Sequence, residues 1–253
     1  MRLHKLTLGT LITLALGLCT TSAMAESEQV NQMYHIKIKP GHAAAFYTDL
    51  AEHAAWRREN GDPWTWWVYR VVNGVDDGDC IIRSGPVSWA DMDAYAEFGG
   101  KGGDMFWETV GEHVEDSHSW IGRLDQKHVR WMPDMSEISL VSIIHYHTKP
   151  GMKESFMQGV DAFHNAIVEH DYPIYYVFDM PINGQPSNII TLALLFKDFA
   201  DMEPEEEPMP QFIQRALGDE AEATLKAFQS SFTSTDSMIL RYLPELSILH
   251  EAE

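Results

Sequence analysis

Two segments of the chain alternate polar and apolar side chains and then end at the same tripeptide. Residues 33–39 run into Lys39-Pro40-Gly41, and residues 140–148 run into Lys149-Pro150-Gly151. Alternation with a period of two is typical of a strand with one buried face, and Pro-Gly is typical of a turn. We therefore expect each segment to be a strand that ends in a turn.

A helix is expected after each of these turns. After the second turn, large apolar residues recur at helical spacing on one face: Phe156, Val160, Phe163 and Ile167. After the first turn, the corresponding face becomes more polar toward its end: Phe46, Leu50, His53 and Arg57. Both segments are predicted to be amphipathic helices.

The pattern that follows each helix is also the same in both halves. An Asn-Gly dipeptide joins two apolar, β-rich runs, which is typical of a hairpin. Ser88 with Asp91, and Asp198 with Asp201, are candidate helix N-caps. The predicted elements are hairpin strands at 64–72 and 80–84 and at 174–182 and 189–196, long helices at 104–124 and 210–230, and last strands at 127–132 and 237–243. Each half is thus predicted to be β-α-β-β-α-β.

A shift of the numbering by 110 superposes the two halves. Phe46 then falls on Phe156, Pro63 on Pro173, and the Asn-Gly dipeptides on each other; one residue later in register, residues 130–136 match residues 241–247. A single register kept over this length indicates two copies of one unit. We therefore predict an α+β fold of two tandem ferredoxin-like units, at 26–136 and 137–253. Their sheets are expected to pack together as an intrachain pseudo-dimeric α/β barrel.

On the Lys-Pro-Gly opening between strand and helix, the unit length and the duplication, the chain resembles the dimeric α/β-barrel superfamily. In particular, it resembles the antibiotic-biosynthesis-monooxygenase and NIPSNAP-like groups. The resemblance implies that ligands bind inside the barrel or between sheet and helices. It also implies cofactor-free oxygenation, and because heme-binding relatives share the fold, it leaves heme open.

The first 25 residues are predicted to be a signal peptide. Arg2 and Lys5 precede an apolar stretch, and Ala23-Met24-Ala25 is typical of a cleavage site. The stretch is too short to cross a bilayer, so we expect a periplasmic or secreted protein with no membrane segment after cleavage. Cys80 is then the one remaining thiol, and its apolar neighbours predict that it is buried.

The mature chain is strongly acidic. Without Arg2 and Lys5 it keeps 16 of its 18 Lys and Arg against 38 Asp and Glu, which gives a net charge of −22. A surface of this charge repels nucleic acid and anionic lipid, so both are excluded as partners. A small-molecule or oligosaccharide ligand is the expected partner, and the protein is expected to be a monomer or a homodimer.

Strand alternation selects the residues expected inside the barrel. His35 and Lys37 share one face of the first strand, and His145 and His147 occupy the equivalent positions of the second copy. The other interior candidates are Tyr69, Arg83, Asp179, and the equivalent pair Arg130 and Arg241. Uncompensated charge is costly to bury, so water, Asp179 or an anionic ligand is expected to neutralise these cations.

Three kinds of chemistry remain open for these residues. His145-x-His147 places two imidazoles on one strand face, which suits a divalent metal. Alternatively, His35 or His145 acts as a base beside the donor Tyr69 and the carboxylate of Asp179. In that case Lys37 and the arginines at 83, 130 and 241 hold an anion. In the third interpretation the histidines are hydrogen-bonded core or surface residues of a binding module.

Other clusters are given structural interpretations. Trp66, in the aromatic segment 64–67, is a candidate substrate platform, although core packing is the default for such residues. Residues 99–103 contain four glycines and match no phosphate-binding motif, so a flexible loop is expected. The segment 203–208 is an acidic, proline-containing loop. The histidines at 113, 118, 164 and 170 are expected to face solvent or to cap helices.

The sequence thus favours an exported barrel that acts on an anionic organic substrate without an organic cofactor, by oxygenase or isomerase chemistry. A polysaccharide lyase acting on uronic-acid sugars would use the same residue types. A heme or divalent-metal protein and a non-catalytic binding module also remain open.

Overall fold

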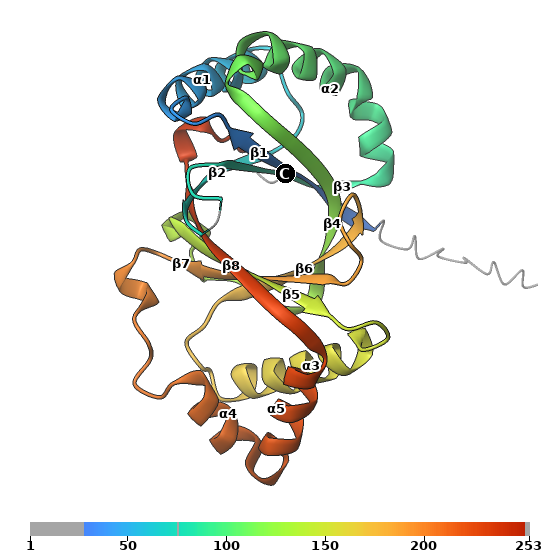
Figure 1. Cartoon of the computed structure of the whole chain (residues 1–253), viewed down its shortest axis with the longest axis vertical. Helices are drawn as coiled ribbons and strands as arrows, with labels where there is room; N and C mark the ends of the chain where they lie inside the picture. The colour runs from blue at the N-terminus through green and yellow to red at the C-terminus, as the bar shows by residue number, and fades with distance from the viewer. Residues whose placement is uncertain (1–27, 75, 251–253) are drawn as a thin grey trace, which may run out of the picture.

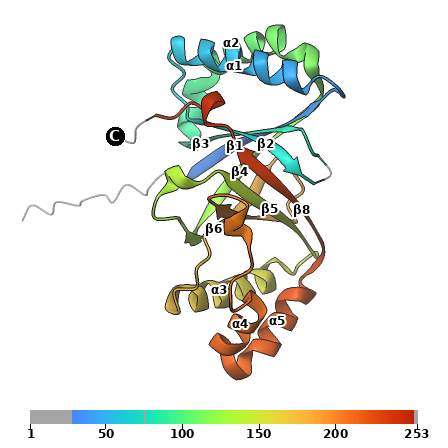
Figure 2. The same cartoon turned by 90° about the vertical axis from the view of Figure 1, so that its left-hand side faces the viewer.

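The computed structural model describes residues 28–74 and 76–250. Figure 1 looks down a β-barrel that has helices on two opposite sides. The turned view in Figure 2 shows the same three layers, with α1 and α2 on one side of the barrel and α3, α4 and α5 on the other. The expected signal peptide and its cleavage site lie outside the described residues. Within the described part of the chain, no helix is long and apolar enough to cross a membrane.

The first half has the predicted order of elements. They are β1 (Gln29–Ile38), α1 (Ala43–Glu59), β2 (Trp66–Asn73), β3 (Cys80–Ser88), α2 (Trp89–Thr109) and β4 (Val114–Arg130). Ser88 caps α2 through a reciprocal pair of hydrogen bonds with Asp91, as its position in the sequence predicts.

The second half repeats this order with one difference. Its elements are β5 (Leu140–Thr148), α3 (Lys153–Glu169), β6 (Tyr176–Asn183), β7 (Ile189–Phe196), α4 (Met209–Leu217), α5 (Ala221–Ser230) and β8 (Phe232–Tyr242). The predicted long helix at 210–230 is divided into α4 and α5, because Gly218 takes a positive φ of 54° at the break.

All eight strands form one closed barrel in the order β1-β3-β2-β8-β5-β7-β6-β4. Each half contributes four neighbouring strands. The halves meet edge to edge, where β2 pairs with β8 and β4 pairs with β6. Every pairing is antiparallel, so β1 and β5, which are four places apart, run in the same direction. The ends of β1 and β5 therefore lie at the same end of the barrel.

Side chains of the barrel alternate between its outside and its inside. Outward residues form two sheet–helix cores, one around Phe46 in the first half and one around Phe156 in the second. Inward residues form a third cluster that includes Ile81, Val141 and Leu240. The helical stripe from Phe156 to Ile167 belongs to the second core, and Cys80 is a buried free thiol in the first, as predicted.

Two sequence-based expectations about the first half are wrong. Residues 99–103 are part of α2 and not a flexible loop. The helix predicted at 104–124 ends at Thr109, and β4 already begins at Val114. Because residues 114–124 cross the barrel as a long strand, sheet pairing with β1 overrides their weak helical pattern.

Candidate functional site

A cavity of about 480 Å³ lies in the second half, between the sheet and its helices. Strands β5 to β8 form one wall and α3, α4 and α5 form the other. Most of the lining is apolar or aromatic, including Ile144, Phe163, Phe178, Leu192, Ile213 and Phe228. A cavity of this size with few polar groups is the usual form of a small-molecule site.

His164 and Tyr176 are the polar pair in this wall. His164 lies on α3 and Tyr176 on β6, and His164 Nδ1 is 2.7 Å from the Tyr176 hydroxyl oxygen. Burial, with the neighbouring charge of His128, lowers the pKa of His164 below its ordinary value. Burial raises the pKa of Tyr176 to about 12. At neutral pH the pair is therefore an uncharged imidazole and an intact phenol, which can exchange a hydrogen bond in either direction.

Strand β4 of the first half reaches this wall through an irregular segment. Its pairing with β6 shifts between Leu124 and Val129, so the intervening residues leave the ladder. His128 is buried there, with Nδ1 2.6 Å from Asp125 and Nε2 2.6 Å from Asp161 of α3. Its ring lies edge-on to that of His164, with centroids 5.5 Å apart. All residues that line the cavity belong to the second half, and His128 of the first half lies behind His164.

In the first half, a buried arginine fills the corresponding space between sheet and helices. Arg57 lies 4.0 Å above the ring of Trp66, and its Nη1 donates to Asp62 at 2.6 Å and to Tyr95 at 2.8 Å. His53 accepts from Arg57 Nε, and burial together with that charge lowers its pKa to about 3. The sequence register places Arg57 opposite Ile167 and His53 opposite Phe163. These polar side chains fill the space between sheet and helices in the first half, whereas Phe163 and Ile167 line a cavity in the second.

Inside the barrel, three of the predicted interior residues come together. Arg83 Nη2 donates to Asn31 at 2.7 Å, and the guanidinium lies 4.6 Å from the Trp67 ring. Burial raises the pKa of Asp179 to about 6, against the opposing influence of Arg83 and Asn31. Burial likewise raises the pKa of Tyr69 to about 12. Arg83, Tyr69 and Asp179 are half-buried and share the interior with the apolar cluster around Ile81.

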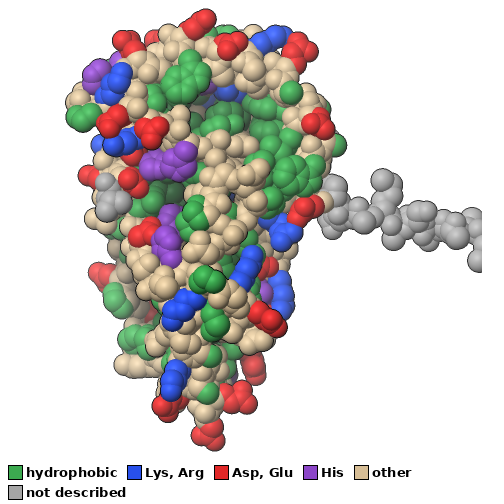
Figure 3. Space-filling model, turned by 45° about the vertical axis from the view of Figure 1, so that its right-hand side comes forward, with side chains coloured by type: hydrophobic (Ala, Val, Ile, Leu, Met, Phe, Trp, Pro, Cys, Tyr) green, Lys and Arg blue, Asp and Glu red, His purple; other side chains and the backbone are tan. Residues whose placement is uncertain are grey.

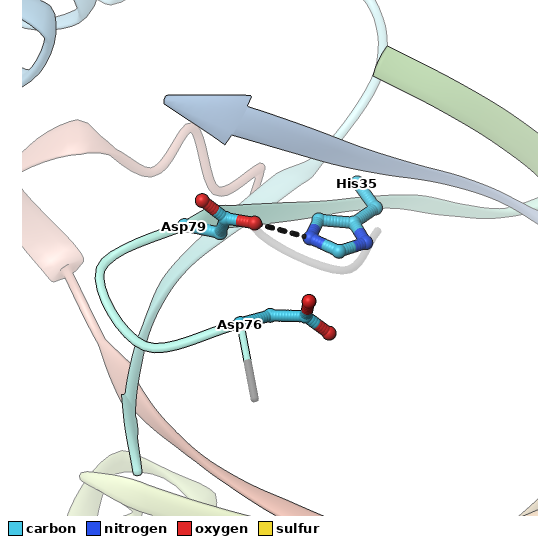
Figure 4. Close-up of side chains that lie close together, drawn as sticks. All are labelled: His35, Asp76 and Asp79. Atoms are coloured by element: carbon cyan, nitrogen blue, oxygen red, sulfur yellow. Dashed lines mark hydrogen bonds and ion pairs between the residues drawn. The ribbon is translucent and has the colours of Figure 1, made fainter. Parts of the chain in front are cut away.

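The predicted histidines lie at the end of the barrel where β1 and β5 finish. His35 Nε2 is 2.9 Å from Asp79, with Asp76 beside it (Figure 4). His145 and His147 share the carboxylate of Asp236, at 2.8 and 2.6 Å. On the face shown in Figure 3, histidine side chains gather next to acidic side chains. The structure therefore gives these imidazoles carboxylate partners and partial exposure to solvent.

Four other predicted residues lie away from the interior. Lys37 is exposed and pairs with Glu115 at 2.7 Å. Trp66 is buried in the helix-side core under Arg57. The remaining two are the arginines of the last strands: Arg130 bonds to Asp171 and to the carbonyl oxygen of Tyr172, and Arg241 is exposed near Phe199. The expected inward orientation of Arg130 and Arg241 is corrected, because each takes the outward position of its strand's alternation.

Two histidines expected to face solvent or to cap helices are instead half-buried, in the case of His164, or buried, in the case of His113. His164 lines the cavity, and His113 is buried with Nε2 2.8 Å from Asp49. A signal for His164 was present in the sequence, since it follows Val160 by four residues and therefore shares the apolar face of the helix. Nothing local in the sequence distinguishes His113.

No protein-family model matches the chain, and no curated protein sequence matches it significantly. Solved structures do share its fold. A presumed monooxygenase from Fusobacterium nucleatum subsp. nucleatum has a TM-score of 0.57 and 8% identity, covering 87% of this chain and 94% of its own. A chlorite dismutase mutant from Candidatus Nitrospira defluvii has a TM-score of 0.55 and 9% identity, covering 87% and 94%.

An anthrone oxidase-like protein also shares the fold, with a TM-score of 0.53 and 11% identity over 86% of this chain and 92% of that one. Identities this low establish the fold alone. The chain has an α+β fold with a closed eight-stranded barrel, and it shares this fold with these solved structures. Its chemistry has to be inferred from its own side chains.

Proposed function

We propose that the protein is an oxygenase-type barrel that binds an apolar, ring-containing small molecule in the cavity of its second half. The observation that carries this proposal is the cavity of about 480 Å³ whose apolar walls hold one neutral imidazole, His164, paired with Tyr176. An aromatic ligand with a hydroxyl group matches both parts of this lining. Its rings would pack on Phe163 and Phe228, and its hydroxyl would reach the imidazole.

The chemistry that fits is cofactor-independent oxygenation of a fused-ring phenol. A neutral imidazole is a suitable base, because a lowered pKa keeps it unprotonated at neutral pH. His164 would accept the hydroxyl proton, and the electron-rich phenolate would reduce dioxygen. One oxygen atom of O₂ enters the ring and the other leaves as water, so a phenol and O₂ give a quinone and H₂O. The likeness to a presumed monooxygenase and an anthrone oxidase-like protein supports this class.

Heme, which the resemblance to the superfamily also implies, does not fit this cavity. His164 could supply an imidazole, but the residues lining the cavity include no Lys or Arg. The two carboxylates of a heme would therefore have no cationic partner in an apolar wall. An absorption spectrum of the purified protein checks this point directly, since bound heme gives an intense Soret band.

The function is tested with His164→Gln, which keeps the approximate size of the side chain but removes the base. Wild-type protein is expected to bind anthrone-like phenols, seen as a thermal shift, and to consume O₂ with them in an oxygen electrode. Loss of a general base lowers the rate by roughly 100- to 10,000-fold. His170→Gln, at the exposed end of the same helix, should keep the wild-type rate. Full activity in His164→Gln, or no binding of any ring compound, would refute the proposal.

The barrel interior is a second candidate site, favoured by the polar residues around Arg83. In this case Arg83 binds a small anion and Asp179, Tyr69, His35 or His145 transfers protons, as the sequence indicates. Arg83→Met then abolishes turnover while His164→Gln does not. A uronic-acid lyase would belong to this site, and its product would give new ultraviolet absorbance.

We also propose that the chain is exported and cleaved after Ala25. The basic start, apolar stretch and Ala-x-Ala sequence support this. The intact mass of protein expressed with its leader should correspond to a chain that begins at Glu26. The element order, which differs only in the division of the last helix, and the register of 110 residues likewise support an origin by tandem duplication.

A further inference from the structure

A separate cluster of metal-binding side chains lies at the end of the barrel, away from the cavity. His35, Asp76 and Asp79 each bring one potential ligand atom within 4.8 Å of the others. The ring of His118 lies edge-on to His35, with centroids 5.0 Å apart. We propose that these residues form a site for a divalent cation of the Zn²⁺ class, with His35, Asp76 and Asp79 as ligands and His118 as the fourth.

Three segments that are distant in sequence supply these ligands. His35 is on β1, His118 is its direct partner on β4, and the two aspartates belong to the hairpin between β2 and β3. Figure 4 shows Asp79 and Asp76 on two sides of the His35 imidazole. A cation held here would connect the hairpin to both strands.

The backbone already fixes one of the carboxylates. Asp79 Oδ1 accepts from the Ile38 amide at 3.1 Å, while Oδ2 lies 2.9 Å from His35. The hairpin itself is closed by hydrogen bonds from the amides of Val71 and Gly78 to the carbonyl oxygens of Asp79 and Val71. Asp79 and His35 are nearly enclosed, with side-chain exposures of 10% and 15%. Ligands held in place before binding lose little conformational entropy when the ion arrives.

The other donor atoms are available for a ligand. Among the described residues, His35 Nδ1, the His118 ring and the Asp76 carboxylate have no hydrogen-bond partner. Asp76 is only half-buried and lies in the hairpin loop, so small movements can bring it closer to the imidazoles. Two imidazoles and two carboxylates form a mixed nitrogen and oxygen set, which Zn²⁺ accepts in tetrahedral geometry.

Two neighbouring histidine–carboxylate groups are less suited to a cation. In the first, His113 Nε2 faces Asp49 and Nδ1 faces His42, at 2.8 and 2.9 Å, so both ring nitrogens are engaged. In the second, His145 and His147 both bond to Asp236, but among the described residues the ligand atoms of these three do not all lie within 4.8 Å of one another. The site around His35 is the one with spare donors.

The choice among ions follows from the same donors. Ca²⁺ and Mg²⁺ prefer all-oxygen sets of six or more ligands, which this cluster does not offer. Imidazole nitrogen favours Zn²⁺ and other late first-row ions. We therefore expect Zn²⁺ to bind with a stoichiometry of one and Mg²⁺ not to compete at millimolar concentration.

The test is calorimetric titration of the chelator-treated full-length protein with ZnCl₂. Wild-type protein is expected to bind one Zn²⁺ and to melt at a higher temperature in its presence. Asp76→Asn and His118→Ala change exposed or half-buried side chains and should fold normally, as circular dichroism will show. Each should weaken Zn²⁺ binding by roughly 10-fold or more, and His35→Ala should abolish it.

A double variant, His145→Ala with His147→Ala, is the matched control at the same end of the barrel. It removes two imidazoles beside a carboxylate and should leave the Zn²⁺ affinity unchanged. The proposal is overturned if wild-type protein binds no Zn²⁺ or if Asp76→Asn and His118→Ala bind as tightly as wild type. Loss of binding in the control variant alone would also overturn it. None of these outcomes depends on the oxygenase proposal, because the readout is metal binding and not turnover.

Discussion

Asp179 and Asp236 show how differently the barrel treats the same residue type. Asp236 lies at the barrel end, where hydrogen bonds from His147 and His145 lower its pKa against the effect of burial. Asp179 points into the barrel, where burial dominates and raises its pKa to about 6. Gly122 on the neighbouring strand leaves room for it, since a Cβ there would lie 2.3 Å from Asp179 Oδ1. The pKa is therefore low for the carboxylate at the end of the barrel and raised for the one in its interior.

This raised pKa predicts a specific dependence of stability on pH. Between about pH 4 and pH 6 the folded state keeps a proton on Asp179 that the unfolded chain has released. The free energy of unfolding therefore falls as the pH rises through this window, by at most about 1.4 kcal/mol per pH unit, and stays lower above it. We expect the free energy of unfolding, measured with urea, to fall with pH in the wild type by this amount more than in Asp179→Asn.

The two proteins are compared by how steeply their free energy of unfolding changes with pH. The absolute free energies are not compared, because Asp179→Asn also changes the surroundings of Arg83. Equal slopes for both proteins between pH 4 and pH 6 would contradict the raised pKa. A ¹³C titration of the carboxylate, with a midpoint near 6, gives an independent measurement.

Among the elements, α2 contains four glycines, and Gly102 is required for packing whereas Gly103 is not. Gly102 is buried, and a Cβ at this position would lie 2.5 Å from Nη2 of Arg57. The guanidinium cannot move aside freely, since it is held between Trp66 and Asp62. At Gly103, by contrast, a Cβ would meet no atom within 4 Å.

Adjacent alanine substitutions in α2 should therefore have opposite effects. Gly102→Ala is expected to destabilise the protein by about 1–3 kcal/mol through overpacking against Arg57. Gly103→Ala should stabilise it by up to about 1 kcal/mol, because alanine has the higher helix propensity. Urea midpoints of the two variants check this, and a stabilising Gly102→Ala would show that the Arg57 network can relax.

The elements also show how far the sequence could predict the structure. Strands with clear alternation are predicted because one face of each is buried: β5 has the predicted limits, whereas β1 begins at Gln29, four residues before the predicted start. The boundary between α2 and β4 was missed, because a glycine-rich helix lacks local helix signals and β4 is a strand only through its pairing with β1 and β6. Pairing between strands that are distant in sequence leaves no signal in the local pattern of polar and apolar residues.

The candidate site was harder to predict for a related reason. The alternation placed Tyr69, Asp179 and Arg83 on the inward face, where the structure has them. It could not show that a cavity lies between the strands of the second half and their helices. The cavity lies in the half that has the smaller, apolar Ile167 where the other half has Arg57. The volume of a cavity between a sheet and its helices depends on how all their side chains pack together, so no single segment of the sequence reveals it.

At the scale of the whole molecule, the closed barrel makes the two halves one unit. Strands of different halves pair at both joints, β2 with β8 and β4 with β6. Unfolding one half would expose two strand edges of the other, along with the apolar cluster around Ile81 and Leu240. We therefore expect the halves to unfold together.

The distribution of tryptophan allows this to be measured. All eight tryptophans lie between residues 56 and 131, so their fluorescence reports on the first half alone. Far-ultraviolet circular dichroism reports on the helices of both halves. The two denaturation curves should coincide, with one midpoint and one slope. Separate midpoints would mean that the halves are independent domains.

The departure of β4 from its ladder has a consequence for assembly. Because Asp125 and His128 leave the first half to meet Asp161 on α3, the imidazole that borders the cavity has a neighbour from the other half. An isolated second half would lack that neighbour even if it folded. If the chain were cut between the halves, the contact of His128 with Asp161 would form only when the two pieces associate, and it would therefore depend on protein concentration.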